Sequence, residues 1–172
     1  MLRPYTCMAL IAAVFLAPAC NGTSHPERSS PSEPGPGNAA NIAVETILQR
    51  SIPGQGGGQL RDTARDEAAW TALWNRLREG GGEGFLPAQP PAVDFGRDMV
   101  IAAAMETQSC VSRITVRGVV QGHGELVVDL LEEPPAPNCV CITSERPLHV
   151  VRLRRSADKV RFAVTRGEVK CG

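Results

Sequence analysis

The sequence predicts an α+β domain, with a mostly antiparallel β-sheet and one main amphipathic helix, placed after a signal peptide and a disordered tether. Three observations support this fold class. Residues 66–78 repeat apolar side chains at helical spacing, whereas residues 98–164 hold several short apolar or alternating runs separated by turn-forming residues. Residues 21–40 contain almost no large apolar side chain. Such a segment cannot bury enough surface to offset its ordering entropy, so we expect it to remain a flexible tether.

Residues 1–19 have the layout of an export signal. A basic start at Arg3 precedes an apolar run over residues 8–16, and small residues lead directly to Cys20. The run is too short to span a bilayer comfortably. A small-residue run that ends on cysteine resembles a bacterial lipoprotein signal, in which the cysteine becomes acylated, for example with palmitate. We therefore expect a lipid anchor at Cys20, with ordinary signal cleavage before an unmodified cysteine as the alternative.

The cysteine count favours the lipid anchor. Of the six cysteines, Cys7 leaves with the signal, so an odd number remains. If Cys20 carries lipid, an even set is left to form disulfides outside the cytoplasm. That set is Cys110, Cys139, Cys141 and Cys171. The two cysteines that are one residue apart cannot bond each other comfortably on an extended strand. We expect Cys110 to pair with one of them and Cys171 with the other.

The clearest predicted helix covers residues 66–78. Asp66 or Thr63 can cap its start by accepting backbone N–H bonds, and a glycine run at 80–82 ends it. Its apolar positions follow the pattern i, i+3, i+4, i+7 and are Trp70, Leu73, Trp74 and Leu77. This spacing indicates one face that packs on a sheet, so we interpret the Trp pair as core and not as a ligand platform.

Strands account for most of the folded domain, which we expect over residues 41–172. A first strand begins near Ile42. Residues 98–105 are almost uniformly apolar, as expected for a strand buried on both faces or at a sheet centre. Residues 111–120 and 126–130 alternate around a hairpin turn at 121–124. Further strands are expected at 139–143, 148–153 and 160–164.

Few residues suggest metal binding or catalysis. The pair Cys139 and Cys141, with Cys110, Cys171 or His149, could be a metal site, but zinc sites usually space paired cysteines by two or more residues. Structural disulfides are the favoured interpretation, and no metal or cofactor is expected. We expect His123 in a solvated turn and His149 on a sheet face, without a recognised nucleophile beside either one. The sequence therefore assigns no catalytic residue.

The charges exclude some partners. The chain has 18 basic and 18 acidic residues, so nucleic acid is not expected to bind. A basic cluster is expected on two neighbouring strands: Arg152, Arg154, Arg155 and Arg161. It could hold an anionic partner or lipid head groups, although a charged rim that protects sheet edges is the favoured interpretation. Glu132 and Glu133 indicate a solvated strand end.

Three stretches resemble one protein family. They are residues 66–70 with Leu73 and Trp74, residues 93–95 leading to 99–102, and Thr143 with residues 147–151. Their order resembles the PrcB family of bacterial secreted and lipid-anchored proteins, named after an accessory lipoprotein of a surface protease complex. The resemblance covers residues 41–166, implies an accessory or binding role and brings no catalytic residues. Cys110 stands where the family tends to have a Gly-rich turn, which suggests that a disulfide replaces glycine geometry here.

These observations favour a non-enzymatic, lipid-anchored binding or accessory module of the bacterial cell envelope. The partner would be an envelope protein, with a protease among the candidates, and the membrane would be reached through the lipid. Contacts are expected from the loops 54–58, 85–91 and 134–138, the last of which contains Pro134, Pro135, Pro137 and Asn138. The alternative is a protease inhibitor that presents this disulfide-braced loop, and a metal-binding or hydrolytic enzyme is a third hypothesis. Asn21 differs from the Asp of an inner-membrane retention signal, which favours the outer membrane.

Overall fold

The computed structural model describes residues 39–53, 56–79, 84–108 and 110–170. The expected signal peptide, Cys20 and nearly all of the tether lie outside the described residues, as does Cys171. The elements in chain order are β1 (Ala40–Ile42), β2 (Val44–Pro53), β3 (Leu60–Ala64), α1 (Glu67–Leu77), β4 (Asp98–Ala104), β5 (Arg113–Gly122), β6 (Glu125–Glu133), β7 (Glu145–Arg154) and β8 (Lys159–Arg166).

The strands divide between two four-stranded sheets, where the sequence analysis expected one. The first sheet has the order β1-β5-β6-β8 and the second the order β2-β7-β4-β3. All neighbouring pairs are antiparallel except β6 and β8, which run parallel. The α+β class with mostly antiparallel strands is confirmed. Alternation of side chains identifies the two faces of a strand, but it cannot say which sheet the strand joins.

The chain crosses from one sheet to the other near its described start. Ile42 of β1 pairs with Val119 of β5, and two residues later Val44 of β2 pairs with Leu153 of β7. The single first strand expected from the sequence is therefore two strands. This crossing places β2 at the outer edge of its sheet, and it leaves β1 beside only residues 119–121 of β5.

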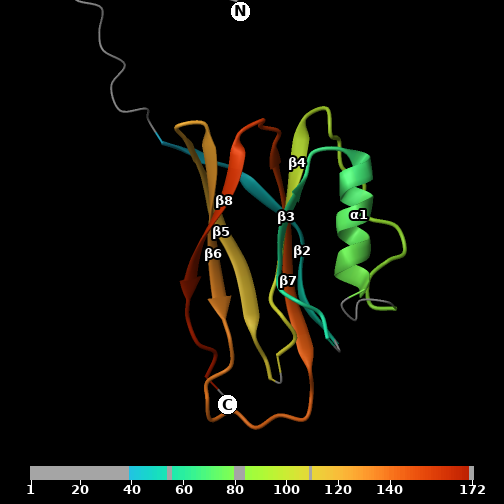
Figure 1. Ribbon diagram of the computed structural model, residues 1–172, viewed down its shortest axis with the longest axis vertical. Coiled ribbons are helices and arrows are strands. Elements are labelled where there is room, and N and C mark those ends of the chain that lie inside the picture. The colour runs from blue at the N-terminus through green and yellow to red at the C-terminus, as the bar shows by residue number, and fades with distance from the viewer. Residues whose placement is uncertain (1–38, 54–55, 80–83, 109, 171–172) are drawn as a thin grey trace, which may run out of the picture. The chain divides into compact units, whose positions relative to one another are not determined.

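The domain has three layers, because the two sheets pack face to face and α1 covers the outer face of the β2-β7-β4-β3 sheet (Figure 1). β4 lies at the centre of this arrangement. Its odd-numbered residues from 99 to 103 face the first sheet, whereas its even-numbered residues from 100 to 104 face the helix. All six are fully buried. The predicted burial of this strand on both faces is confirmed.

The helix begins where the sequence predicts. The Asp66 side chain caps α1 by accepting a hydrogen bond from the backbone N–H of Ala69 at 2.8 Å. Trp70 and Trp74 are 2% and 1% exposed and meet edge to face, with ring centroids 5.2 Å apart. Their burial against the sheet confirms that the Trp pair is core.

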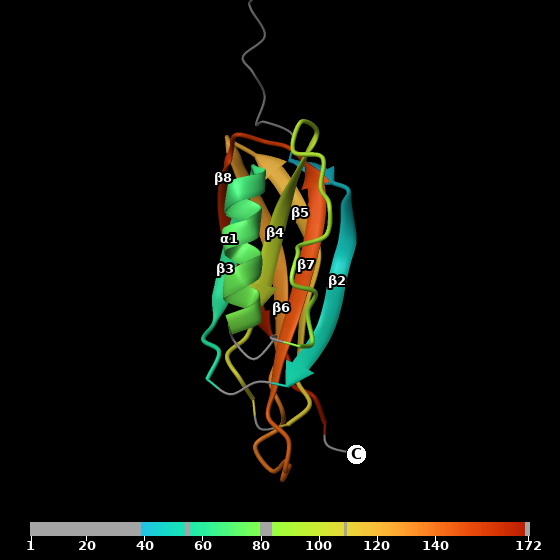
Figure 2. The same cartoon turned by 90° about the vertical axis from the view of Figure 1, so that its right-hand side faces the viewer.

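The two indoles also hold the segment that follows the helix. Trp70 Nε1 donates to the carbonyl oxygen of Pro91 at 2.9 Å, and Trp74 Nε1 donates to that of Pro87 at 2.8 Å. Figure 2 shows this segment lying beside α1 on the same face of the sheet. The loop 85–91, which was expected to be a binding loop, is therefore tied to the core by two hydrogen bonds from buried indoles.

A buried arginine joins the end of the helix to the strands. The Arg146 guanidinium is 2% exposed and donates to the carbonyl oxygens of Gly58 at 2.8 Å, Leu77 at 3.2 Å and Met105 at 3.4 Å. Leu77 is the last residue of α1. The Arg146 cation therefore satisfies one of the carbonyls at the C-terminus of the helix and interacts favourably with the helix dipole. Burial lowers the pKa of Arg146.

Glu132 is buried, so the expectation that it forms a solvated strand end is wrong. It shares the inner face of β6 with Leu130, two residues earlier, because side chains alternate along a strand. Its Oε1 accepts hydrogen bonds from Arg61 Nη2 at 2.6 Å and from Gln59 Nε2 at 3.2 Å. The ion pair with Arg61 connects β6 of one sheet to β3 of the other.

Candidate functional site

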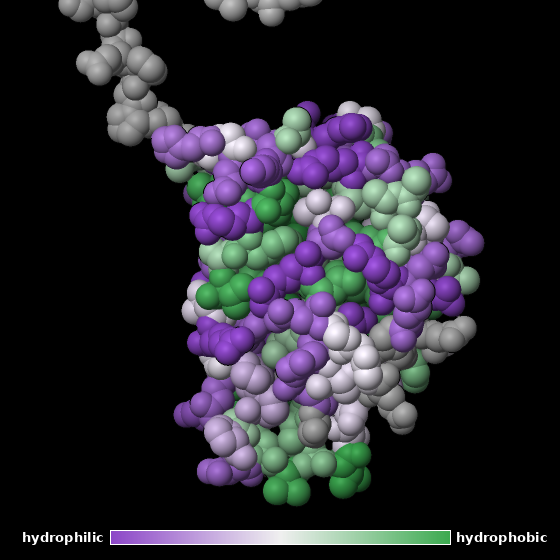
Figure 3. Space-filling model, viewed as in Figure 1, coloured by the Kyte–Doolittle hydropathy of each residue, from purple (hydrophilic) through white to green (hydrophobic). Residues whose placement is uncertain are grey.

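The connection from β6 to β7 carries the most exposed large apolar side chains of the described residues. In this connection Val140 and Ile142 are 95% and 103% exposed. Val111, which lies just before β5, is 59% exposed. In Figure 1 this connection lies at the end of the sandwich away from the β5–β6 turn, and Figure 3 shows apolar side chains gathered at that end. We call Val111, Val140 and Ile142 the apolar tip.

A disulfide braces the apolar tip. Cys110 and Cys141 are bonded across a sequence separation of 31, with Cα atoms 5.3 Å apart. The prediction that Cys110 pairs with one of the two closely spaced cysteines is confirmed, and the partner is Cys141. Cys139 is also disulfide-bonded, whereas the expected pairing of Cys171 lies outside the described residues. The disulfide holds Val111 close to the segment that carries the other two tip residues.

The expected strand over residues 139–143 is wrong. The structure places these residues in no strand, and β7 begins only at Glu145. The alternation of cysteines with β-branched residues imitates a strand, but the segment lies beyond the end of both sheets and its apolar side chains are exposed. The assumption that Cys139 and Cys141 lie on an extended strand is therefore wrong as well.

The proline-rich loop is held in part by the C-terminal segment. The Val169 N–H donates to the Pro134 carbonyl at 2.9 Å, and the Ala136 N–H donates to the Val169 carbonyl at 3.0 Å. Pro134 is half-buried, whereas Pro137 is exposed. The exposed part of the expected 134–138 loop therefore begins only at Pro137, and it continues into the apolar tip.

His149 is a buried polar link between the two sheets. It is 3% exposed, its Nδ1 accepts the backbone N–H of Val116 at 2.8 Å, and its Nε2 lies 3.0 Å from Thr46 Oγ1. Because Nδ1 accepts, the neutral ring carries its proton on Nε2, which donates to Thr46. Burial lowers the pKa of His149, which favours this neutral form. With both nitrogens engaged, the ring stabilises the fold and has no free position for proton transfer.

His123 lies in the hairpin turn, as the sequence predicts. It forms the two-residue connection between β5 and β6 with Gly124, and the two residues have φ values of 53° and 74°. Two consecutive positive φ angles match the twist of the flanking strands. The His123 side chain is exposed.

The expected arginine cluster does not lie on neighbouring strands. Arg152 belongs to β7 and Arg161 to β8, and these strands are in different sheets. Arg152 donates hydrogen bonds of 2.7 to 3.0 Å to the carboxylate of Glu45, and Arg161 Nε donates one of 2.9 Å to the carboxylate of Glu125. The hydrogen bond to Glu45 raises the pKa of Arg152. These acidic partners reduce the positive charge that the arginines offer to an anionic ligand.

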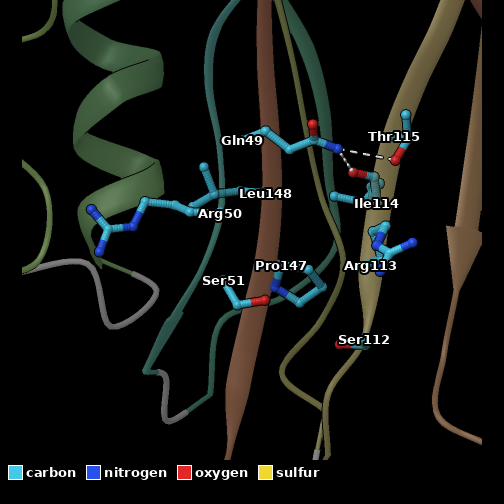
Figure 4. A pocket seen from close by; sticks show the side chains of 9 residues that line it. All are labelled: Gln49, Arg50, Ser51, Ser112, Arg113, Ile114, Thr115, Pro147 and Leu148. Carbon is cyan, nitrogen blue, oxygen red and sulfur yellow. Dashed lines mark hydrogen bonds between the residues drawn. The ribbon is translucent and has the colours of Figure 1, made fainter. Parts of the chain in front are cut away.

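A cleft of about 520 Å³ lies between β2 and the start of β5 (Figure 4). Its walls are residues 49–51 of β2, residues 112–115 and the β7 residues Pro147 and Leu148. We call it the edge cleft. The edge cleft was not predicted from the sequence, because it depends on β1 being short and on β2 and β5 belonging to different sheets. Neither property follows from a local pattern.

The described residues hold no group of three or more His, Cys, Asp or Glu side chains that could bind a metal ion. Within the same ranges, no helix has the length and apolarity that a membrane crossing requires. Comparison of the chain with protein-family models, curated proteins and solved structures finds no match. The chain's own surfaces are therefore the basis for its function.

Proposed function

We propose that this chain is a non-enzymatic binding or accessory module, anchored by lipid at Cys20 in the bacterial cell envelope, that holds a partner protein through the apolar tip. The exposure of Val140 and Ile142 beside the Cys110–Cys141 disulfide is the observation that carries the proposal. The resemblance to the PrcB family supports an accessory role, with a protease among the candidate partners.

Hydrophobic burial provides the driving force in this proposal. Covering an exposed Val or Ile side chain stabilises a complex by about 1.5–3 kcal/mol. Large apolar side chains that are almost wholly exposed on a braced loop are typical of contact surfaces. The disulfide limits the conformations of the loop before binding, so less ordering entropy is lost when a partner docks.

Photo-crosslinking in intact cells tests the proposal. A photoreactive residue at position 142 is expected to give a discrete crosslinked protein, whereas one at Val164, an exposed position on β8, is expected not to give it. With the partner purified, Val140→Ser with Ile142→Ser should weaken binding about 100-fold or more, since two apolar contacts are lost. Val164→Ser is the matched control. The same products from both positions, or none from either, would count against the proposal.

The second candidate is a protease inhibitor that presents the same braced segment. Residues 137–144, which are exposed except for the half-buried Cys139, favour it, since an exposed loop braced by a disulfide can enter a cleft at low entropic cost. Incubation with envelope proteases separates the two functions. Inhibition that is lost in the Val140→Ser, Ile142→Ser chain indicates an inhibitor, and a partner bound without loss of proteolytic activity indicates an accessory module.

The anchor is proposed from the sequence alone and is tested separately. Mass spectrometry of the mature protein should find acyl chains on Cys20 at the amino terminus. The same measurement with and without reduction counts the disulfides and tests the expected bond between Cys139 and Cys171. An amino terminus without lipid would remove the anchor from the proposal and leave the binding surface to its own test.

A further inference from the structure

The edge cleft lies where two sheet edges are open. β2 is one of the two outer strands of its sheet. β5 has β6 on one side, and on the other side β1 reaches only residues 119–121. In the part of the chain that the structure describes, residues 113–118 of β5 therefore have no strand beside them on the cleft side. An open edge presents backbone N–H and C=O groups that can template a further strand.

Side chains occupy two of these backbone groups. Gln49 Nε2 donates to the carbonyl oxygen of Ile114 at 3.1 Å and to Thr115 Oγ1 at 3.0 Å (Figure 4). His149 accepts the N–H of Val116 at 2.8 Å. The amide of Gln49 thus makes the hydrogen bond that the N–H of an added strand would make. Gln49 comes from an exposed part of β2, so an arriving backbone can displace it.

The buried side chain of Ser112, like the open edge of β5, indicates a ligand site. Its side chain lines the cleft and the residue is only 4% exposed, yet its Oγ has no hydrogen-bond partner among the described residues. A buried hydroxyl without a partner costs free energy and calls for an explanation. A backbone group of a bound peptide would supply the missing partner.

The charge of the cleft selects the kind of peptide. Its two charged residues are Arg50 and Arg113, and no carboxylate lines it. Arg113 is loosely paired, with Nη1 3.7 Å from Glu133 Oε2 and 62% of its side chain exposed. The Arg50 guanidinium turns toward α1 and lies 3.4 Å from the Phe85 carbonyl, so Arg113 is the principal cation for a ligand.

We propose that the edge cleft binds a short extended peptide of a partner protein that carries an acidic side chain, added as a strand along the start of β5. Main-chain hydrogen bonds to an open edge give affinity in this mode, and side-chain contacts give specificity. The peptide backbone replaces Gln49 at Ile114 and reaches Ser112, while its carboxylate pairs with Arg113. This site is separate from the apolar tip and does not depend on the function proposed for it.

An array of pentapeptides with β-branched residues around a central Glu or Gln tests the site, with the full chain as the binding protein. The Glu peptides should bind more tightly than their Gln counterparts. Arg113→Gln should weaken the binding of Glu peptides about 10-fold or more, because a charge-assisted hydrogen bond is lost. Arg117→Gln is the matched control on the same strand, since Arg117 pairs with Asp129 outside the cleft. Gln49→Ala should leave binding intact or tighten it.

Amide chemical shifts locate the bound peptide. The largest changes should fall at residues 112–116, and Val140→Ser with Ile142→Ser should leave both affinity and shifts unchanged. Equal binding of Glu and Gln peptides, equal effects of the two arginine variants, or changes confined to the tip would overturn the proposal. So would a dimer of this chain that Arg113→Gln abolishes, because a second copy would then be the occupant. An array without any binder would also refute it.

Discussion

Acidification is expected to weaken the fold through His149. The neutral ring accepts one hydrogen bond from the β5 backbone and donates one to Thr46, and the residue is only 3% exposed. Protonation would put a donor on Nδ1 opposite the N–H of Val116 and would place a charge between the sheets. Both effects disfavour the protonated folded state, which agrees with the lowered pKa of His149.

The direction and size follow from linkage. The pKa of His149 lies below its ordinary value of 6.5 in the folded state, so the unfolded chain binds more protons as the pH falls through this value. The stabilising effect of the neutral ring is therefore complete above the unfolded pKa and is lost as the pH falls below it. The loss is about 1.4 kcal/mol per pH unit until the pH reaches the folded pKa, below which it stops increasing.

Denaturant unfolding between pH 7.5 and 5.0 measures the effect, with His149→Asn as the comparison. Asparagine can accept the Val116 N–H through its side-chain oxygen and does not titrate. The free energy of unfolding of the native chain should therefore fall more steeply below pH 6.5 than that of the variant. Identical pH slopes would refute the reasoning. If the variant does not fold, an NMR titration of His149 decides, and a pKa at or above 6.5 in the native chain would refute it.

Three further predictions concern stability and use denaturant unfolding of the full chain. Replacing Cys110 and Cys141 with Ser should lower the free energy of unfolding by about 3–4 kcal/mol, because the disulfide closes a loop across a sequence separation of 31. An unchanged denaturation midpoint would contradict this. Trp74→Phe should lower the free energy of unfolding by about 2–4 kcal/mol, since the buried indole leaves a cavity and its hydrogen bond to the Pro87 carbonyl is lost, and a cost below that of an exposed substitution such as Val164→Ser would count against it. Glu132→Ala should cost about 2–3 kcal/mol, toward the low end for a buried pair because Arg61 is partly exposed; salt should not abolish the effect.

Local patterns predicted the elements with strong signals. The apolar face of α1 and its Asp66 cap follow from spacing and side-chain chemistry, because a helix forms from contacts between residues close in sequence. The unbroken apolar run of β4 predicted its burial on both faces, because such a run has no polar face to leave in water. Residues 139–143 alternate in the same way as a strand, but a strand also needs a neighbour, and the sheets end before this segment.

The sequence by itself determined the fold class, the helix and its cap, the alternating strands and the availability of Cys110 for a disulfide. Only the tertiary structure decided that the strands form two sheets, that Glu132 and His149 link those sheets from inside, that Cys141 is the partner of Cys110, and that the start of β5 is left open beside Gln49. The reason is distance along the chain. Side-chain periodicity records the local environment of each strand, whereas the meeting of edges and inner faces depends on residues that are far apart in the chain, such as Thr46 and His149, which are 103 positions apart.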